Sequence, residues 1–177
     1  FLYYKNKKKR SESSKPPRFF TAEELPTVTI QLPIFNEQFV VDRLIEAICK
    51  MDYPREKLDI QLLDDSTDET IATAGAIVDR YAALGNPITH IHRTNREGYK
   101  AGALENGLKT ARGEFIAIFD ADFLPAPDFL RLTIPYFMNP RGGAAIGMVQ
   151  TRWTDLNSGY SLLTQVERLL PGGQFGV

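Results

Sequence analysis

The chain has 177 residues, of which 43% are apolar and 24% charged, and this is enough for one globular domain with a hydrophobic core. Its formal net charge of −1 gives no reason to expect a nucleic-acid partner, and its single cysteine, Cys49, excludes an internal disulfide. No stretch reaches the roughly 18 consecutive apolar residues that a membrane-spanning helix needs.

The first 20 residues differ from the rest of the chain in charge. They contain seven Lys and Arg against one acidic residue, whereas the remainder contains 14 bases and 21 acids. The aromatic start FLYY, followed at once by the basic cluster KNKKKR, is typical of the cytoplasmic end of a membrane helix; a solvated basic tail is the alternative. We therefore expect residues 1–20 to form a basic juxtamembrane segment and linker, and residues 21–177 to form the folded domain.

From residue 28 onward, short apolar runs alternate with segments of helical periodicity. In chain order we expect a strand at 28–33, a helix at 36–51, a strand at 58–65, a helix at 67–84, a strand at 88–93, a helix at 99–111, a strand at 114–121, a helix at 126–138 and a strand at 144–150. This alternation predicts an α/β fold with a Rossmann-like, mainly parallel sheet and helices on both faces. In such sheets ligands bind beyond the carboxyl-terminal ends of the strands.

Candidate site residues, most of them polar or charged, lie at the ends of four of the predicted strands. These are Pro33, Phe35, Asn36 and Glu37 after the first, Asp64 and Asp65 after the second, Arg93 and Arg96 after the third, and Asp120 and Asp122 after the fourth. Some have a structural explanation. Asn36 is placed to cap the first helix, and Ser66 with Glu69 matches the capping box S-x-x-E at the start of the second.

Asp120 and Asp122 have no such structural role, because the next helix begins too far away, near Pro127. In an extended segment residues i and i+2 project to the same side, so the two carboxylates would face one point and repel each other. A divalent cation removes that repulsion, and Mg²⁺ or Mn²⁺ typically takes one or two carboxylates and completes its shell with phosphates and water. The D-x-D pattern at the end of a buried strand therefore predicts a metal–phosphate site.

The segment HRTNREGYKAGAL (92–104) supplies the complementary positive charge. Arg93, Arg96 and Lys100 flank Gly98 where a strand passes into a helix, and the backbone N–H groups of a helix start favour anions. An exposed basic turn is the alternative. The chain has neither the P-loop pattern nor a G-x-G-x-x-G after its first strand, which argues against P-loop enzymes and dinucleotide-binding dehydrogenases.

Four other residues are weaker candidates for chemistry. His90 and His92 share a face of the third strand, but no third ligand follows at metal-binding spacing, so we expect them to be structural. Cys49 is expected to pack in the core. Trp153 could equally line a sugar site or pack in the core.

Five ordered motifs make the chain resemble the processive family 2 glycosyltransferases, the cellulose-synthase-like group, and within it the glucomannan and β-glucan synthase-like branch. They are LPIFNE (32–37), LLDDSTDET (62–70), HRTNREGYKAGAL (92–104), FDADFLPAPDFL (119–130) and MVQTRWTDLN (148–157). The resemblance spans residues 26–168. It implies a GT-A nucleotide-diphosphosugar transferase fold that faces the cytoplasm and is attached to a membrane through flanking helices outside this chain.

The resemblance also implies roles for individual residues. The donor-binding residues would be Pro33, Phe35, Glu37, Asp64, Asp65, Arg96, Lys100 and Asp120. Asp120 and Asp122 would hold a Mg²⁺ or Mn²⁺ ion that bridges the diphosphate and stabilises the leaving nucleoside diphosphate. Phe35 stands where the family usually has Tyr, so one polar group is absent.

The activity implied by the resemblance is the inverting transfer of a sugar from UDP-glucose or GDP-mannose to a growing β-linked polysaccharide. Such a transfer needs a general base, which the family supplies from a Thr-Glu-Asp motif far downstream of D-x-D, and a later Q-x-x-R-W binds the acceptor. The chain's Q-x-R-W, residues 150–153, is one residue short and is not that motif. We therefore expect a domain truncated at its C-terminus that binds donor and metal, with the catalytic base beyond Val177.

Three other functions remain open from the sequence. The sugar could pass to a lipid acceptor of the dolichyl phosphate or ceramide type, and the downstream motifs would distinguish this. The chain could also be a non-catalytic nucleotide-sugar-binding module, which would explain the absent base. A nucleotidyltransferase shares the α/β fold and the metal chemistry, but it usually has a Gly-rich basic loop after its first strand, and PIFNEQ (33–38) is not one.

Overall fold

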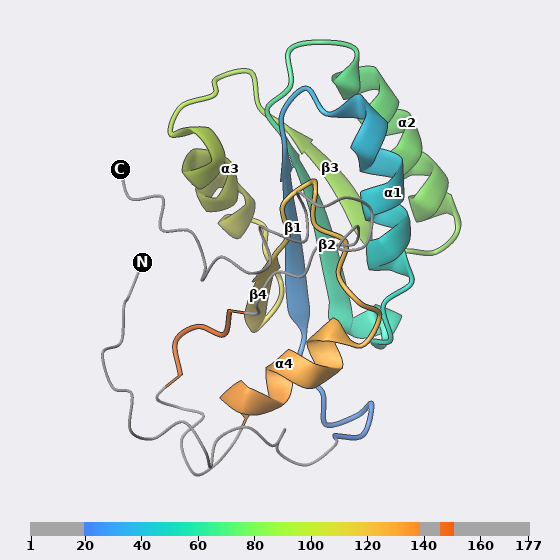
Figure 1. The fold of residues 1–177 in the computed structure, drawn as a ribbon, viewed down its shortest axis with the longest axis vertical. Coiled ribbons are helices and arrows are strands. Elements are labelled where there is room, and N and C mark those ends of the chain that lie inside the picture. Colours follow the sequence, from blue (N-terminus) through green and yellow to red (C-terminus); the bar gives the residue numbers. More distant parts are fainter. Residues whose placement is uncertain (1–19, 139–145, 151–177) are drawn as a thin grey trace, which may run out of the picture. The chain divides into compact units, whose positions relative to one another are not determined.

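The computed structural model describes residues 20–138 and 146–150 (Figure 1). Its elements are β1 (Val28–Ile34), α1 (Gln38–Cys49), a 3-10 helix η1 (Arg55–Lys57), β2 (Leu58–Asp64), α2 (Thr70–Ala83), β3 (Ile88–His92), α3 (Tyr99–Leu108), β4 (Phe115–Ile118) and α4 (Phe129–Phe137). The described strands form one sheet in the order β3-β2-β1-β4, and every neighbouring pair is parallel. The predicted α/β class with a parallel sheet is confirmed.

Helices cover both faces of the sheet, as predicted. On one face, alternate residues of β1 and β2 pack against α1 and α2 in the hydrophobic core, and Figure 1 shows these two helices side by side. The residues of this core face are Val28, Ile30, Leu32 and Ile34 of β1 with Leu58, Ile60 and Leu62 of β2, none more than 8% exposed. The α1 residues that complete it, Val41, Leu44, Ile45 and Ile48, recur at helical spacing.

The opposite face of the sheet carries α3. Here Gln31 of β1 donates a hydrogen bond to Gln61 of β2 (3.1 Å), and both side chains also bind backbone carbonyls of the helix. A Cβ atom at Gly107 would lie 2.5 Å from the side-chain nitrogen of Gln31. Glycine at this position therefore allows the helix to lie close to the two buried amides.

Two predicted strands differ from the structure. Residues 146–150 adopt no strand, while residues 144 and 145 lie outside the described part of the chain. Apolar composition is not sufficient for a strand, because its backbone groups need a neighbouring strand, and none pairs with 146–150 in the described sheet. The fourth strand ends at Ile118 rather than at residue 121, because the backbone turns back and Phe123 N donates to Asp120 O (2.9 Å).

The predicted cap of the first helix is wrong. The helix α1 begins at Gln38, and Asn36 precedes it in a left-handed conformation with φ of 54°. Asn36 binds the loop after β2 instead: its side-chain oxygen accepts from Thr67 N (2.9 Å), and its own N–H donates to Ser66 Oγ (2.9 Å). The loops that follow the two neighbouring strands are thus hydrogen-bonded to each other.

The capping box predicted for the second helix is also absent. The helix α2 begins at Thr70, and its N-cap residue Glu69 makes no side-chain cap hydrogen bond. Ser66 is engaged by Asn36, so its hydroxyl serves the contact between loops. Asp68 does stabilise the helix start, because its carboxylate accepts from Thr70 N (3.0 Å).

Candidate functional site

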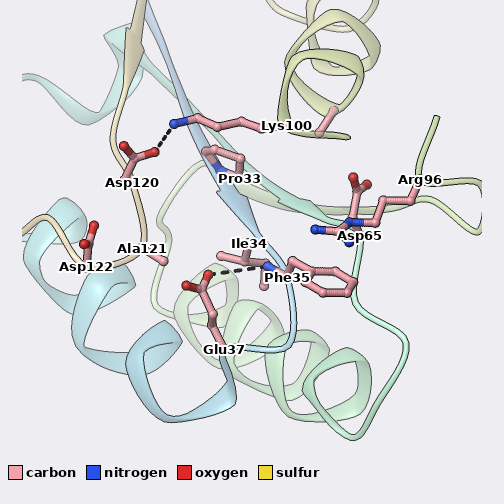
Figure 2. Close-up of a pocket in the computed structure, with 11 residues that line it drawn as sticks. Pro33, Ile34, Phe35, Glu37, Asp65, Arg96, Lys100, Asp120, Ala121 and Asp122 are labelled. Carbon is pink, nitrogen blue, oxygen red and sulfur yellow. Dashed lines mark hydrogen bonds and ion pairs between the residues drawn. The ribbon is translucent and has the colours of Figure 1, made fainter. Parts of the chain in front are cut away.

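A cavity of about 450 Å³ lies at the carboxyl-terminal edge of the sheet (Figure 2). Its lining residues come from the ends of β1, β2 and β4, the loop after β3 and the start of α3: Pro33, Ile34, Phe35, Glu37, Asp65, Arg96, Lys100, Ala103, Asp120, Ala121 and Asp122. Every predicted donor-binding residue except Asp64 lines it, as do both predicted metal ligands. Their convergence follows from the parallel sheet, whose strands all end at this edge.

The apolar part of the lining was only partly visible in the sequence. Ile34, Ala103 and Ala121 line the cavity without having been predicted. Ile34 and Ala121 are direct neighbours of predicted residues. Ala103 lies one helical turn after Lys100, on the buried side of α3, and this spacing was the signal that could have identified it.

Asp64 and Asp65 point to different environments although they are adjacent. Successive residues of a strand face opposite sides of the sheet, so Asp64 turns away from the cavity that Asp65 lines. Asp64 is fully buried; it lies 2.8 Å from His90 Nε2 and accepts from Ser66 N (2.8 Å). Asp64 is not among the residues that line the cavity, so its role in donor binding stays a prediction.

The ionisation of Asp64 reflects these contacts. Burial opposes the charged form of the carboxylate, but the hydrogen bonds from His90 and Ser66 outweigh this and lower the pKa of Asp64 below its ordinary value of 3.8. His92 lies on the same strand, with its Nε2 3.2 Å from Ser66 O. Both histidines thus hold the segment after β2, in agreement with the structural role expected for them.

Asp65 is held by Arg93, an arginine that is partly buried. Arg93 Nε donates to Asp65 Oδ1 (2.7 Å) and Arg93 Nη2 to Asp65 Oδ2 (2.5 Å), which makes the pair bidentate. The two side chains are only 11% and 5% exposed, and the hydrogen bond to Asp65 raises the pKa of Arg93. Arg93 is therefore not a free cation facing an anion site, and the cavity does not include it.

Arg96 stacks on an aromatic ring at the cavity wall. Its guanidinium carbon lies 3.3 Å from the ring centroid of Phe35 and 5.1 Å from that of Tyr99. Figure 2 shows Phe35 and Arg96 on the Asp65 side of the cavity. On the same strand end, Glu37 Oε2 accepts from Phe35 N (3.4 Å), so the carboxylate of Glu37 orders the turn after β1.

The other side of the cavity carries the D-x-D carboxylates. Lys100 Nζ forms an ion pair with Asp120 Oδ1, as Figure 2 shows. Asp122 lies in the turn after Asp120 and is exposed. It forms no hydrogen bond or ion pair with any residue that the structure describes.

These two carboxylates suit an open Mg²⁺ or Mn²⁺ site, in which the protein supplies only some of the ligands, better than a site closed by protein ligands alone. The described residues contain no group of three or more His, Cys, Asp or Glu that could hold a metal by themselves. Two carboxylates at an open cavity match a hard cation that takes the rest of its oxygen ligands from a diphosphate and from water. The adjacent Lys100 would add positive charge for the same anion.

The remaining candidates lie outside this site. Cys49 packs partly buried against the core, and burial raises the pKa of its thiol to about 11. Trp153 and the basic segment of residues 1–19 fall outside the described residues, so the linker and membrane predictions stay predictions. Among the helices that the structure describes, none is both long and apolar enough to span a bilayer.

Comparison with known proteins agrees with this geometry. The sequence model of the family described as glycosyl transferase family 2 matches residues 29–168. Glucomannan 4-beta-mannosyltransferase 1 of Oryza sativa subsp. japonica is 44% identical over 148 residues, and glucomannan 4-beta-mannosyltransferase 2 of Arabidopsis thaliana is 44% identical over 153 residues. The alignments cover 81% and 84% of this chain but only 28% of each relative.

A solved structure shows the same fold. Mannosyltransferase PcManGT from Pyrobaculum calidifontis, in complex with GDP-Man and Mn²⁺, superimposes with a TM-score of 0.61 at 34% sequence identity. The match covers 67% of this chain and 34% of that one. The parallel sheet with its helices is thus that of the GT-A glycosyltransferases.

Proposed function

Because the chain belongs to glycosyl transferase family 2, we propose that its cavity binds a nucleotide-diphosphosugar donor together with a divalent metal ion. The observation that carries this proposal is the convergence of eight predicted site residues from separate parts of the sequence on one cavity. On one side of the cavity lies the carboxylate of Asp65. On the other side lie Lys100 and the carboxylates of Asp120 and Asp122. This arrangement can hold a nucleoside at one end and a metal-bound diphosphate at the other.

Each end of the cavity has a distinct role in this proposal. Pro33, Phe35 and Asp65 contact the nucleoside, with Asp65 accepting hydrogen bonds from it. Lys100 binds the diphosphate, and Asp120 and Asp122 hold the metal ion. When bound, that ion neutralises the charge that develops on the departing nucleoside diphosphate.

We propose GDP-mannose as the donor and a β-linked mannan or glucomannan as the acceptor. Two relatives at 44% identity are glucomannan 4-beta-mannosyltransferases, and the structural neighbour at 34% identity was solved with GDP-Man. The transfer is proposed to be inverting and to take place at the cytoplasmic face of a membrane. The aromatic and basic start of the chain supports the membrane part of this proposal.

Calorimetric titration tests the donor site. GDP and UDP are titrated separately into the 177-residue chain with Mn²⁺ and again with EDTA. We expect GDP to bind more tightly than UDP, and only with metal, because the carboxylates alone would repel the diphosphate. Asp120→Ala should abolish measurable binding, since a ligand of the metal is lost.

The matched control is Asp79→Ala, which removes an exposed aspartate from α2 on the other face of the sheet. It should bind GDP as the unmodified chain does. If a folded chain bound neither nucleotide in the presence of Mn²⁺, the proposed function would be refuted. Preference for UDP would refute the choice of GDP-mannose alone.

A further inference from the structure

We propose that Arg93 is a positioning residue that couples the two ends of the donor cavity. It lies outside the cavity, but it binds the carboxylate of Asp65 and the backbone of the turn that carries Lys100. The inference rests on the proposed function, because it concerns how Asp65 and Lys100 are held for the nucleoside and the diphosphate.

Arg93 joins three segments through one guanidinium group. Besides its two bonds to Asp65 after β2, Arg93 Nη1 donates to Glu97 O (3.1 Å) in the loop, and Arg93 Nη2 donates to Tyr99 O (3.1 Å) at the start of α3. These contacts use four of the five N–H groups of arginine. The backbone N–H of Arg93 also donates to Asp64 O (3.0 Å), which fixes its own position at the end of β3.

The turn held by Arg93 has an unfavourable backbone conformation. Gly98 has φ of 71° and Tyr99, which has a side chain, has φ of 50°. A left-handed conformation is unfavourable for a tyrosine and persists only where surrounding contacts impose it. Arg93 provides such contacts, because it binds the carbonyl groups of Glu97 and Tyr99 on either side of Gly98.

Lys100 directly follows this turn. Its direction is therefore set by the same backbone that Arg93 holds, and its ammonium group reaches Asp120 across the cavity. The start of α3 packs closely against this turn, since a Cβ atom at Gly102 would lie 2.0 Å from Glu97 O and 2.9 Å from Arg93 Nη1. Asp65 and Lys100, which bind opposite ends of the donor, thus depend on one side chain.

Lysine could not replace this arginine. Its ammonium group is a single point with three donors and cannot match two carboxylate oxygens and two carbonyls in a planar fork. Arg93→Lys keeps the charge beside Asp65 but should release the turn before Lys100. A second Arg–Asp pair on the same sheet, Arg112 with Asp59, provides a control far from the cavity, with Arg112 Nη2 2.9 Å from Asp59 Oδ1.

The experiment is calorimetric titration of GDP with Mn²⁺ into the 177-residue chain. We expect Arg93→Lys to weaken binding about tenfold, as for the loss of hydrogen bonds to a charged group, and Arg112→Lys to leave the affinity unchanged. Thermal unfolding of each variant establishes that it is folded at the temperature of the titration, so that the affinities of folded proteins are compared.

A double-mutant cycle separates positioning from a general loss of stability. In the unmodified chain, Lys100→Met should weaken GDP binding about tenfold. In the Arg93→Lys background the same change should cost less than about threefold, because Lys100 is already misplaced and the two effects are not additive. In the Arg112→Lys background the full effect of Lys100→Met should remain.

Arg93→Lys could unfold below the assay temperature, and the cycle is then run with Asp65→Asn. This substitution exchanges one acceptor for a donor and opens the fork from its other side. It should likewise reduce the effect of Lys100→Met. Additive effects in the folded variants, or unchanged affinity of folded Arg93→Lys, would overturn the coupling while leaving the donor site intact. Failure of the unmodified chain to bind GDP or UDP would refute the donor site itself, and the coupling with it.

Discussion

The strand β2 has an aspartate–arginine pair near each end, and the two pairs have different surroundings. At its amino-terminal end, Asp59 Oδ2 accepts from Thr29 Oγ1 (2.8 Å) and Arg112 N (3.0 Å), while Oδ1 accepts from the guanidinium of Arg112. The carboxylate of Asp59 thus accepts hydrogen bonds from both β1 and Arg112. The Arg112 side chain is 71% exposed. This pair connects β1, β2 and the segment that precedes β4.

At the carboxyl-terminal end, the pair of Asp65 and Arg93 is only 5% and 11% exposed and borders the cavity described above. Across this cavity the carboxylate of Asp122 has no partner among the described residues, and Arg96 and Lys100 line the same cavity. The comparison shows that charged residues at a strand end do not by themselves make a binding site. What differs is whether the strand end borders a cavity that other charged side chains also line.

The largest effect is expected from a glycine at the amino-terminal end. A Cβ atom at Gly113 would lie 2.1 Å from Thr29 N and 2.6 Å from the carbonyl carbon of Val28, both of which are backbone atoms of the central strand. Gly113→Ala should therefore lower the free energy of unfolding by about 3 kcal/mol or more, as for severe overpacking. Urea denaturation measures this change.

The control for this glycine is Gly147→Ala. No heavy atom of the described residues lies within 4 Å of the Cβ position at Gly147, so the free energy of unfolding should change by less than about 0.5 kcal/mol. Equal stability of the two variants would show that the amino-terminal end of the sheet is not as tightly closed as described.

The second prediction compares the replacement of each of the two aspartates, Asp59 and Asp65, by asparagine. Asp59→Asn should lower the free energy of unfolding by about 2 kcal/mol, because a carboxylate with several donors becomes an amide that turns one donor toward another. Its affinity for GDP with Mn²⁺ should not change. Asp65→Asn should instead weaken GDP binding, and a reversed pattern of stability and affinity would contradict the division of roles.

The third prediction concerns pH and Asp64. Because its pKa is lowered in the folded protein, the stabilisation from Asp64 is fully present above its ordinary value of 3.8 and is lost as the pH falls through the folded pKa. At pH 6, Asp64→Asn should lower the free energy of unfolding by roughly 1 kcal/mol through its weakened bonds to His90 and Ser66. Thermal unfolding at pH 6 and pH 3 should show a smaller difference between variant and unmodified chain at the lower pH.

The smallest effect is expected at the cavity wall. Phe35→Leu removes the ring on which Arg96 stacks, and the exposed cation–π contact contributes about 0.5–1 kcal/mol to the free energy of unfolding. Phe35→Tyr keeps the ring and should leave the stability unchanged. A loss with Tyr as large as with Leu would mean that the stacking is not the source of the effect.

Local patterns in the sequence were sufficient for the fold class and for most of the cavity. Helical and strand periodicities are properties of short segments, so the strands and α-helices from β1 to α4 could be predicted, although their ends shifted by a few residues and the short 3-10 helix η1 was not predicted. Since parallel strands end at one edge of a sheet, Asp65, Lys100, Asp120 and Asp122 could be expected to meet there. The identity of the motifs then pointed to the family that comparison confirmed.

The partner of each side chain was decided only by the tertiary structure. Asn36 and Ser66 are good caps for their own helices, yet they bind each other's loops because β1 and β2 are neighbours. Asp64 and Asp65 look equivalent in sequence, but the strand pleat buries one carboxylate and turns the other to the cavity. The fork between Arg93 and Asp65 joins residues 28 positions apart, and no local pattern contains it. Periodicity depends on neighbours in sequence, whereas these pairings depend on which strands lie side by side.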